Sequence, residues 1–237
     1  MISVIIPAYN EEANLSSLLD SLVELRKKQN WSCEIIVVND NSKDRTPVIA
    51  DEYSKKYAFI KTIHRKKRKN GMGYALIEGT KHAKGEFVIW TMGDKSDDIN
   101  VCPKMIEKLK SGYDLVFGSR YMKGGSKGDL DLFKASLSSG YTLLCRIIFG
   151  IPVHDITNAF RCFRREVFNN ISLIAGEFAT SPEFAIKAHL AGFKLGEVPT
   201  KHKDRIAGKA KFKMLKMSIS YISLLKYRFI IKKSYKH

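Results

Sequence analysis

Strand-like and helix-like segments alternate through the first 120 residues, and this alternation restricts the possible folds more than any other feature of the sequence. Short apolar runs typical of buried strands are separated by stretches in which apolar residues recur at helical spacing. The predicted strands are Ser3 to Ile6, Glu34 to Asp40, Phe59 to His64, Phe87 to Thr91 and Asp114 to Gly118. We therefore predict a mostly parallel, doubly wound α/β sheet with helices on both faces.

The second half of the sequence is less regular. Residues 130–149 and 183–191 have helical patterns, and the run "KLGEVPT" predicts a last strand. We predict one domain over residues 1–211, followed by a basic amphipathic tail over residues 212–237.

Residues 212–231 predict an amphipathic helix within this tail. Tyr221, Ile222 and Phe229 fall on its apolar side, and Lys216 falls on the other. Such a helix either lies in a membrane interface, where its basic side meets anionic headgroups, or packs against the core of its own domain.

The net charge is +17, and it is concentrated near the C-terminus. From Lys201 to His237 there are twelve Lys or Arg residues and one acid, Asp204. This excess indicates an anionic partner: nucleic acid, phosphorylated ligands or an acidic membrane surface. No nucleic-acid recognition motif is present, which argues against the first. Scattered cysteines, no signal peptide and no apolar run of about 18 residues predict a cytoplasmic protein with reduced thiols.

The segment "VIWTMGDKSDD", residues 88 to 98, is a buried strand that ends in a group of carboxylates. Oxygen ligands at a strand end suit Mg²⁺ or Mn²⁺, and such an ion can bind a diphosphate. Asp94, Ser96 and Asp97 are the candidate metal ligands. The alternative is a solvated turn in which Asp97 or Asp98 caps the next helix.

Polar residues follow other predicted strands in the same way, and ligands of such sheets bind beyond these strand ends. Asp40 is a candidate acceptor for a base or ribose, Tyr9 a surface against a base and Glu11 a further acceptor, although each also suits a turn or helix start. The basic run Arg65 to Lys69 precedes Gly71 and a helix start, where cations and backbone amides can bind phosphate. The same run also suits a solvated loop.

Six segments in register carry a resemblance to a known family. They are "SVIIPAYNEEANL", "VVNDNSKDRT", "NGMGYALIEGTKHAKGEFVIWTMGDKSDD", "GSRYMKGG", "HDITNAFRCFRREVF" and "GEVPTKHKDRIAGKAK". Together they resemble the family-2 inverting glycosyltransferases of GT-A, Rossmann-like fold, in particular the dolichyl-phosphate (polyprenyl-phosphate) mannose or glucose synthases. The resemblance covers roughly residues 1 to 211. It implies transfer of a hexose from a donor such as GDP-mannose or UDP-glucose to a lipid phosphate, with inversion and with Mg²⁺ or Mn²⁺ as cofactor.

The resemblance also implies roles for individual residues. Asp94 and Ser96 match metal ligands, Arg205 matches an arginine on a loop over the donor phosphates, and Asp155 matches an acid near the reacting sugar. Residues in the positions that hold the nucleotide are Pro7, Tyr9, Glu11 and Asp40, and those near the acceptor phosphate are Arg120, Lys134 and Ser138.

The sequence departs from the family pattern at three positions. The first acid of the Asp-x-Asp metal motif falls on Met92, the residue after Asp94 is Lys95, and Lys134 stands where the family usually has Arg. Lys95 is a candidate source of positive charge in place of an ion, and Asp97 a candidate replacement for the missing ligand.

A phosphate acceptor is ionised near pH 7 and needs no strong general base. The helix at 130–149 then either holds the lipid or belongs to the core, and the protein is expected to bind peripherally at the cytoplasmic face of a membrane. One alternative is a transferase of the same fold acting on a saccharide hydroxyl, with Asp155 or Glu177 as base. Another is a catalytically weak nucleotide-sugar binding protein, suggested by Met92 and Lys95.

Overall fold

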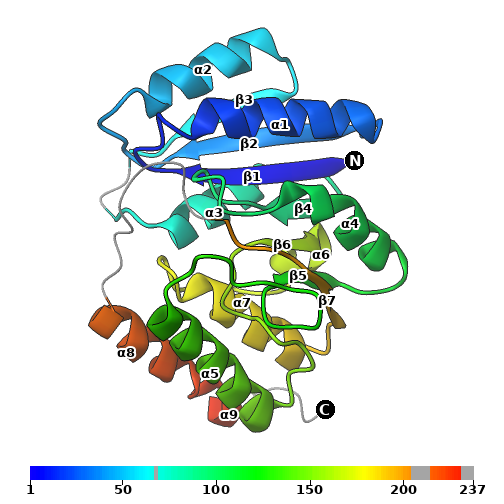
Figure 1. Cartoon of the computed structure of the whole chain (residues 1–237), viewed down its shortest axis with the longest axis vertical. Helices are drawn as coiled ribbons and strands as arrows, with labels where there is room; N and C mark the ends of the chain where they lie inside the picture. The colour runs from blue at the N-terminus through cyan, green and yellow to red at the C-terminus, as the bar shows by residue number, and fades with distance from the viewer. Residues whose placement is uncertain (67–68, 204–213, 231–237) are drawn as a thin grey trace.

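The computed structural model describes residues 1–66, 69–203 and 214–230. Within these residues, seven strands form one sheet in the order β3-β2-β1-β4-β6-β5-β7 (Figure 1). The strands are β1 (Ile2–Ala8), β2 (Cys33–Asn39), β3 (Ile60–His64), β4 (Phe87–Trp90), β5 (Leu115–Ser119), β6 (Arg161–Arg164) and β7 (Leu195–Pro199). Only β6 runs antiparallel to its neighbours, so the prediction of a mostly parallel α/β sheet is confirmed.

Helices cover both faces of the sheet. One face packs against α1 (Leu15–Lys28), α2 (Thr46–Lys56) and α4 (Cys102–Lys110), the last preceded by the short 3₁₀ helix η1 (Ile99–Val101). The other face packs against α3 (Met72–Lys81), α6 (Arg165–Asn169) and α7 (Thr180–Leu190). Beyond α7 lie α5 (Leu132–Phe149), α8 (Met214–Leu224) and α9 (Tyr227–Ile230), which form the lower end of the molecule in Figure 1.

Pro7 lies inside β1 and does not stop it as the sequence predicted. Strand β4 pairs with β1 only from Ile2 to Ile5, whereas β2 continues beside β1 to Ala8. Because β1 is an edge on the β4 side beyond Ile5, a residue without a backbone N–H is tolerated there.

Within the described residues 214–230, the tail forms two helices, α8 and α9, and not the one continuous helix predicted for residues 212–231. Tyr221, Leu224 and Tyr227 are buried in the same hydrophobic core as α7, so this segment packs on its own domain. Ile222 and Phe229, which the helical spacing placed beside Tyr221, are instead exposed. In the described part of the chain, no helix has both the length and the apolar character needed to cross a bilayer.

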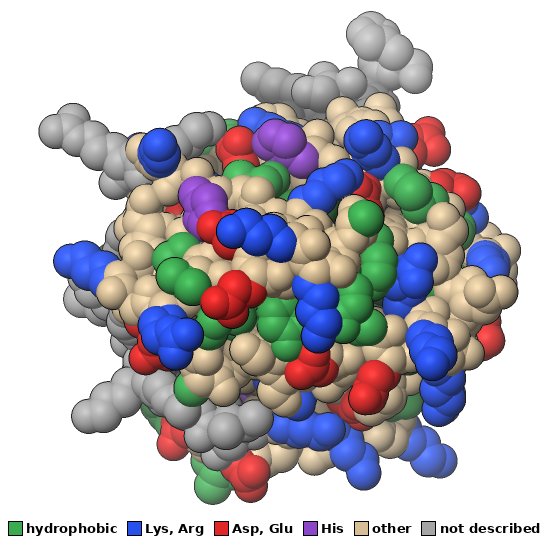
Figure 2. Space-filling view, turned by 90° about the horizontal axis from the view of Figure 1, so that it is seen from above, with side chains coloured by type: hydrophobic (Ala, Val, Ile, Leu, Met, Phe, Trp, Pro, Cys, Tyr) green, Lys and Arg blue, Asp and Glu red, His purple; other side chains and the backbone are tan. Residues whose placement is uncertain are grey.

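Figure 2 shows the surface of the molecule at the end that is uppermost in Figure 1. Lys and Arg side chains are spread over this face, with Asp and Glu side chains between them. This mixture differs from the continuous basic stripe that tracks a nucleic-acid backbone.

Candidate active site

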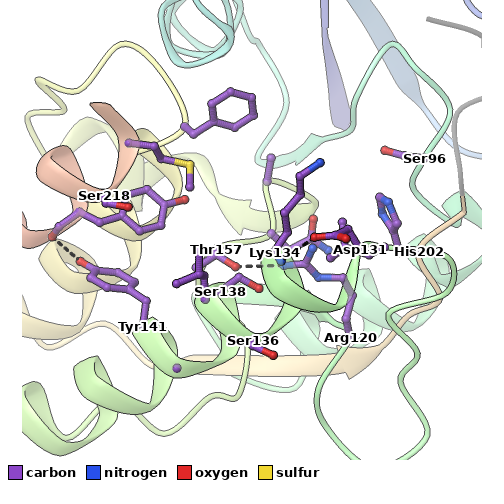
Figure 3. Close-up of a pocket in the computed structure, with 18 of the residues that line it drawn as sticks. Ser96, Arg120, Asp131, Lys134, Ser136, Ser138, Tyr141, Thr157, His202 and Ser218 are labelled. Carbon is purple, nitrogen blue, oxygen red and sulfur yellow. Dashed lines mark hydrogen bonds between the residues drawn. The ribbon is translucent and has the colours of Figure 1, made fainter. Parts of the chain in front are cut away.

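A cavity of about 810 Å³ lies beyond the carboxyl ends of β4 and β5, between the sheet and the helices α5 and α8. Six of the predicted site residues line it: Asp94, Ser96, Asp97, Arg120, Lys134 and Ser138. Figure 3 shows Arg120 and Lys134 close together at one end, with Ser96 beyond them, and Tyr141 and Ser218 at the other end. The cavity lies next to the topological switch between β1 and β4, where open α/β sheets bind ligands.

The loop after β4 turns its carboxylates back toward the strand end. The Asp97 Oδ2 atom accepts hydrogen bonds from the Met92 backbone N–H at 2.9 Å and from Thr91 Oγ1 at 3.2 Å. The Asp94 Oδ1 atom accepts one from the Ser96 backbone N–H at 3.1 Å. The pKa of Asp97 is raised to about 7: burial raises it most, the Met92 N–H opposes this rise, and the nearby Asp94 charge adds to it.

Lys95 does not face this cavity. Its backbone adopts a left-handed conformation, and its ammonium donates to the Ser17 hydroxyl on α1. The structure therefore gives no support to the suggestion that Lys95 replaces the charge of a metal ion, because its ammonium is bonded to α1 and does not line the cavity.

Arg120, directly after β5, is held by a buried ion pair with Asp155. Its Nε and Nη2 atoms donate to the two carboxylate oxygens at 2.7 and 3.0 Å, and Nη2 also reaches Thr157 Oγ1 at 3.0 Å. Burial raises the pKa of Asp155, but the Arg120 charge and hydrogen bonds outweigh it and hold that pKa below its usual value. Asp155 is fully buried beneath Arg120 and is not among the residues that line the cavity.

Two further predicted residues lie on the first turns of α5. Asp131 caps this helix and accepts from the Lys134 backbone N–H at 3.1 Å, and the Lys134 side chain lines the cavity. Ser138, one turn later, hydrogen-bonds the Tyr121 hydroxyl. The end of β5 and the start of α5 therefore bring two cations and a hydroxyl to one place.

The residues predicted to hold a nucleotide lie at neighbouring strand ends, outside the lining of the cavity. Asp40 accepts from the Gly71 backbone N–H at 2.6 Å and forms a buried ion pair with Arg65. Arg65 is therefore buried against Asp40, whereas Lys66 and Lys69 of the same run are exposed, as in a solvated loop. A buried guanidinium immediately after a strand could have been found by the strand-end argument used for Asp40.

The segment after β1 packs against the loop after β4. The Glu11 backbone N–H donates to Thr46 Oγ1 at 2.7 Å, and Glu11 Oε2 accepts from the Asn14 side chain at 2.7 Å. A Cβ atom added to Gly93 would come within 2.8 Å of the Pro7 carbonyl oxygen and 3.5 Å of Glu11 Cγ, so the loop after β4 lies against the end of β1 and the segment that follows it. Tyr9, between Pro7 and Glu11, is half-buried.

Sequence reasoning missed two other residues near the cavity. His202, just beyond β7, lines it (Figure 3). Arg161, fully buried in β6, donates to the carbonyl oxygens of Asn158 at 2.5 Å and Ser181 at 2.8 Å, and so fixes the cavity wall at Asn158. His202 follows a predicted strand end, whereas Arg161, between apolar residues and close to Arg164 and Arg165, carried no such signal. Arg205 lies outside the described residues.

Comparisons with known proteins identify the family of the chain. Residues 3–172 match the glycosyl transferase family 2 domain. The chain is 36% identical over 216 residues to a dolichol-phosphate mannosyltransferase of Pyrococcus furiosus, covering 90% of this chain and 59% of that protein. It is 30% identical over 240 residues to the dolichyl-phosphate beta-glucosyltransferase ALG5A of Trichomonas vaginalis, covering 94% of this chain and 72% of that protein.

Solved structures agree on the fold. Glucosyl-3-phosphoglycerate synthase from Mycobacterium tuberculosis, in complex with Mn²⁺, UDP and phosphoglyceric acid, superposes with a TM-score of 0.71 at 19% identity. The superposition covers 96% of this chain and 78% of that one. The fold is that of a GT-A glycosyltransferase, and the chain belongs to glycosyl transferase family 2.

The ion pair generates a prediction about stability. We expect Asp155→Asn to lower the free energy of unfolding at pH 7 by about 3–5 kcal/mol, because it leaves the Arg120 charge buried and unpaired. A depressed native pKa contributes stability above the unfolded value, so the difference from wild type should shrink below about pH 4. Urea unfolding at pH 7 and at lower pH measures it. Asp51→Asn, at an exposed pair with His64, is the control and should cost under about 1 kcal/mol. Equal losses in both variants would contradict the prediction.

Proposed function

We propose that this chain transfers a hexose from a nucleoside diphosphate sugar to a polyprenyl phosphate, with inversion at the sugar. The observation that carries the proposal is the composition of one cavity. Carboxylates line one end, Arg120 and Lys134 follow, and the other end is walled by apolar side chains of α5 and α8, including Leu137, Leu144 and Ile222. An amphiphile with a phosphate head and a hydrocarbon tail fits this order of side chains. The names of the two curated relatives support the same acceptor class.

The donor is proposed to bind along the strand ends of β1, β2 and β4. Asp40, held by Arg65 and the Gly71 N–H, is proposed to meet the base or ribose, with Pro7, Tyr9 and Glu11 beside it. The diphosphate then reaches the loop that carries Asp94. This places the departing diphosphate close to the cationic part of the cavity, where its developing charge is stabilised.

A divalent cation is part of the proposal, with Asp94, Ser96 and Asp97 as its ligands. These oxygen donors fit Mg²⁺ or Mn²⁺, and two buried carboxylates lie close enough that the Asp94 charge raises the pKa of Asp97. Within residues 1–66, 69–203 and 214–230, no group of three or more His, Cys, Asp or Glu side chains could hold a metal ion. Phosphate oxygens and water would therefore complete the coordination. When bound, the ion would neutralise charge on the diphosphate.

The acceptor phosphate is proposed to bind between Arg120 and Lys134, with Ser138 beside it. A phosphate monoester is already a nucleophile near pH 7, so the protein needs to orient it in line with the leaving group. Asp155 cannot serve as a base in this geometry, because its carboxylate is buried and bound by Arg120. Glu177, the other candidate base for a saccharide acceptor, is not among the residues that line the cavity. These observations disfavour the saccharide alternative.

A peripheral membrane position, at the cytoplasmic face, follows from the proposed acceptor. The outer face of α5 is an exposed apolar stripe of Leu132, Phe133, Leu137, Leu143, Leu144 and Ile147. Ile219 and Ile222 on α8 and Phe229 on α9 are exposed as well. Leu137, Leu144 and Ile222 also line the cavity, so its apolar end opens on this stripe. We propose that α5 lies against the bilayer and that the acceptor enters from there.

The transfer itself is tested with a lipid extract, a free oligosaccharide and labelled nucleotide sugars. We expect labelled product on the polyprenyl phosphate. Product only on the free oligosaccharide would favour the saccharide alternative, and nucleotide binding without turnover on either acceptor would favour a binding protein.

For the donor site, we expect Asp94→Asn to lower kcat/KM at least about 100-fold, because a ligand of the diphosphate-bound ion is lost. Isothermal titration should also show that Mg²⁺ no longer tightens binding of UDP or GDP. Asp98→Asn is the control, since Asp98 caps η1 in the same loop and does not line the cavity. Equal Mg²⁺ dependence in Asp94→Asn and wild type would refute the ligand assignment.

For the acceptor site, we expect Lys134→Ala to raise KM for the polyprenyl phosphate about tenfold, the cost of a lost charge-assisted hydrogen bond. KM for the nucleotide sugar should not change, and Lys134→Arg should retain most of the affinity. Lys123→Ala removes a nearby exposed charge outside the cavity and serves as control. An equal rise in KM for the nucleotide sugar and for the polyprenyl phosphate would contradict the assignment of Lys134 to the acceptor phosphate.

For the membrane face, we expect the double variant Leu143→Glu and Ile147→Glu to lose binding to anionic liposomes in co-sedimentation. Burying two carboxylates in the interface is unfavourable, whereas turnover on a short, water-soluble acceptor should persist. Val48→Glu, at an exposed apolar position on α2, is the matched control. Undiminished co-sedimentation of the double variant would remove α5 from the membrane contact.

A further inference from the structure

Glu183 is a fully buried acid on α7, outside the cavity, and four donors converge on its carboxylate. The backbone N–H groups of Ile174 and Ala175 donate at 3.0 and 2.8 Å. Lys187 Nζ donates at 2.7 Å, and the Tyr227 hydroxyl of α9 donates at 3.1 Å. One side chain therefore joins α7, the segment 170–179 between α6 and α7, and the C-terminal helix α9.

Segment 170–179 is packed tightly against the start of α3. The Tyr74 backbone N–H donates to the Gly176 carbonyl oxygen at 3.0 Å. A Cβ atom on Gly71 would collide with that same oxygen, and one on Gly176 would collide with the Tyr74 ring. Segment 170–179 cannot shift toward α3 without moving Gly71 or Tyr74, because no space separates them.

The start of α3 is also the wall of the proposed donor site. The Gly71 N–H donates to Asp40 Oδ2, and the Arg65 guanidinium, which pairs with Asp40, lies 5.6 Å from the centre of the Tyr74 ring. Continuous contacts thus run from Tyr227 through Glu183 and segment 170–179 to Asp40. Phe178, in the same segment, lines the cavity.

We propose that Glu183 is a positioning residue for the nucleotide donor, and that docking of α9 through the Tyr227 hydroxyl sets the affinity of the donor site. The inference rests on the proposed function, since Asp40 is taken to contact the nucleotide. Arg228 of α9 also donates to the Ile148 carbonyl oxygen of α5, so α9 is joined to the helix proposed to lie on the bilayer. The packing of α9 and α5 against the domain is then coupled to donor binding through these packed, hydrogen-bonded contacts. Each of the two events therefore favours the other.

Tyr227→Phe tests the coupling, because it removes one hydroxyl and keeps the buried ring. We expect the dissociation constant for UDP or GDP, measured by calorimetry with Mg²⁺, to rise about fivefold or more. KM for the nucleotide sugar should rise with it, while kcat stays near the wild-type value. Tyr53→Phe is the matched control: it removes a hydroxyl bonded to Asp20, on the helices of the opposite face, and should leave nucleotide affinity unchanged.

Two further measurements make the outcome decisive. If circular dichroism shows that Glu183→Gln is folded, this variant should weaken nucleotide binding at least as much as Tyr227→Phe. Hydrogen exchange in α9 should slow when nucleotide is added to wild type but not to Tyr227→Phe. Two outcomes would overturn the coupling while the proposed function stands, provided that wild type binds the nucleotide. One is equal affinity of Tyr227→Phe and wild type, and the other is an equal loss of affinity in Tyr53→Phe. If wild type binds neither UDP nor GDP, the proposed function itself fails.

Discussion

The buried ion pair between Arg120 and Asp155 is the interaction on which the architecture of the cavity depends. A carboxylate that is fully buried is tolerated only when charge and hydrogen bonds compensate it, so Asp155 ties the segment before β6 to the end of β5. The same contacts hold the Arg120 guanidinium in one orientation at the cavity wall. Arg161 secures the other side of that segment through the Asn158 carbonyl oxygen.

From this fixed point the cavity is assembled by two different parts of the fold. The ends of parallel strands supply carboxylates and a guanidinium, because backbone direction brings those ends to one edge of the sheet. Helices α5 and α8 supply the apolar wall, because each buries one side and leaves the other exposed. The proposed water-soluble, anionic donor and the proposed lipid acceptor would meet where these two surfaces adjoin.

Features set by short-range sequence patterns were predictable. Most of the strands, and the polar residues Asp94, Ser96, Asp97 and Arg120 at their ends, follow from apolar runs and the residues after them, whereas Lys134 and Ser138 were implied only by the family resemblance. Features set by distant partners were not. Asp155 pairs with a residue 35 positions away, Lys95 turns toward α1, and Arg65 is buried by Asp40 and Tyr74. In α8 and α9, apolar residues occupy two sides, one buried against the core and one exposed. Helical spacing alone could not predict which of these apolar residues are buried.

The loop after β4 shows how one altered position is compensated by its neighbours. Met92 stands where the resemblance implies an acid, yet its backbone N–H is bound by Asp97, so the loop keeps a defined path back to the strand end. Asp97 thereby holds the loop and faces the cavity at once. As a proposed ligand with Asp94 and Ser96, it would offer a divalent ion only part of its coordination, and phosphate oxygens and water would supply the rest. The proposed ion and the donor diphosphate would therefore bind as one unit, since neither alone satisfies the charge that the other presents.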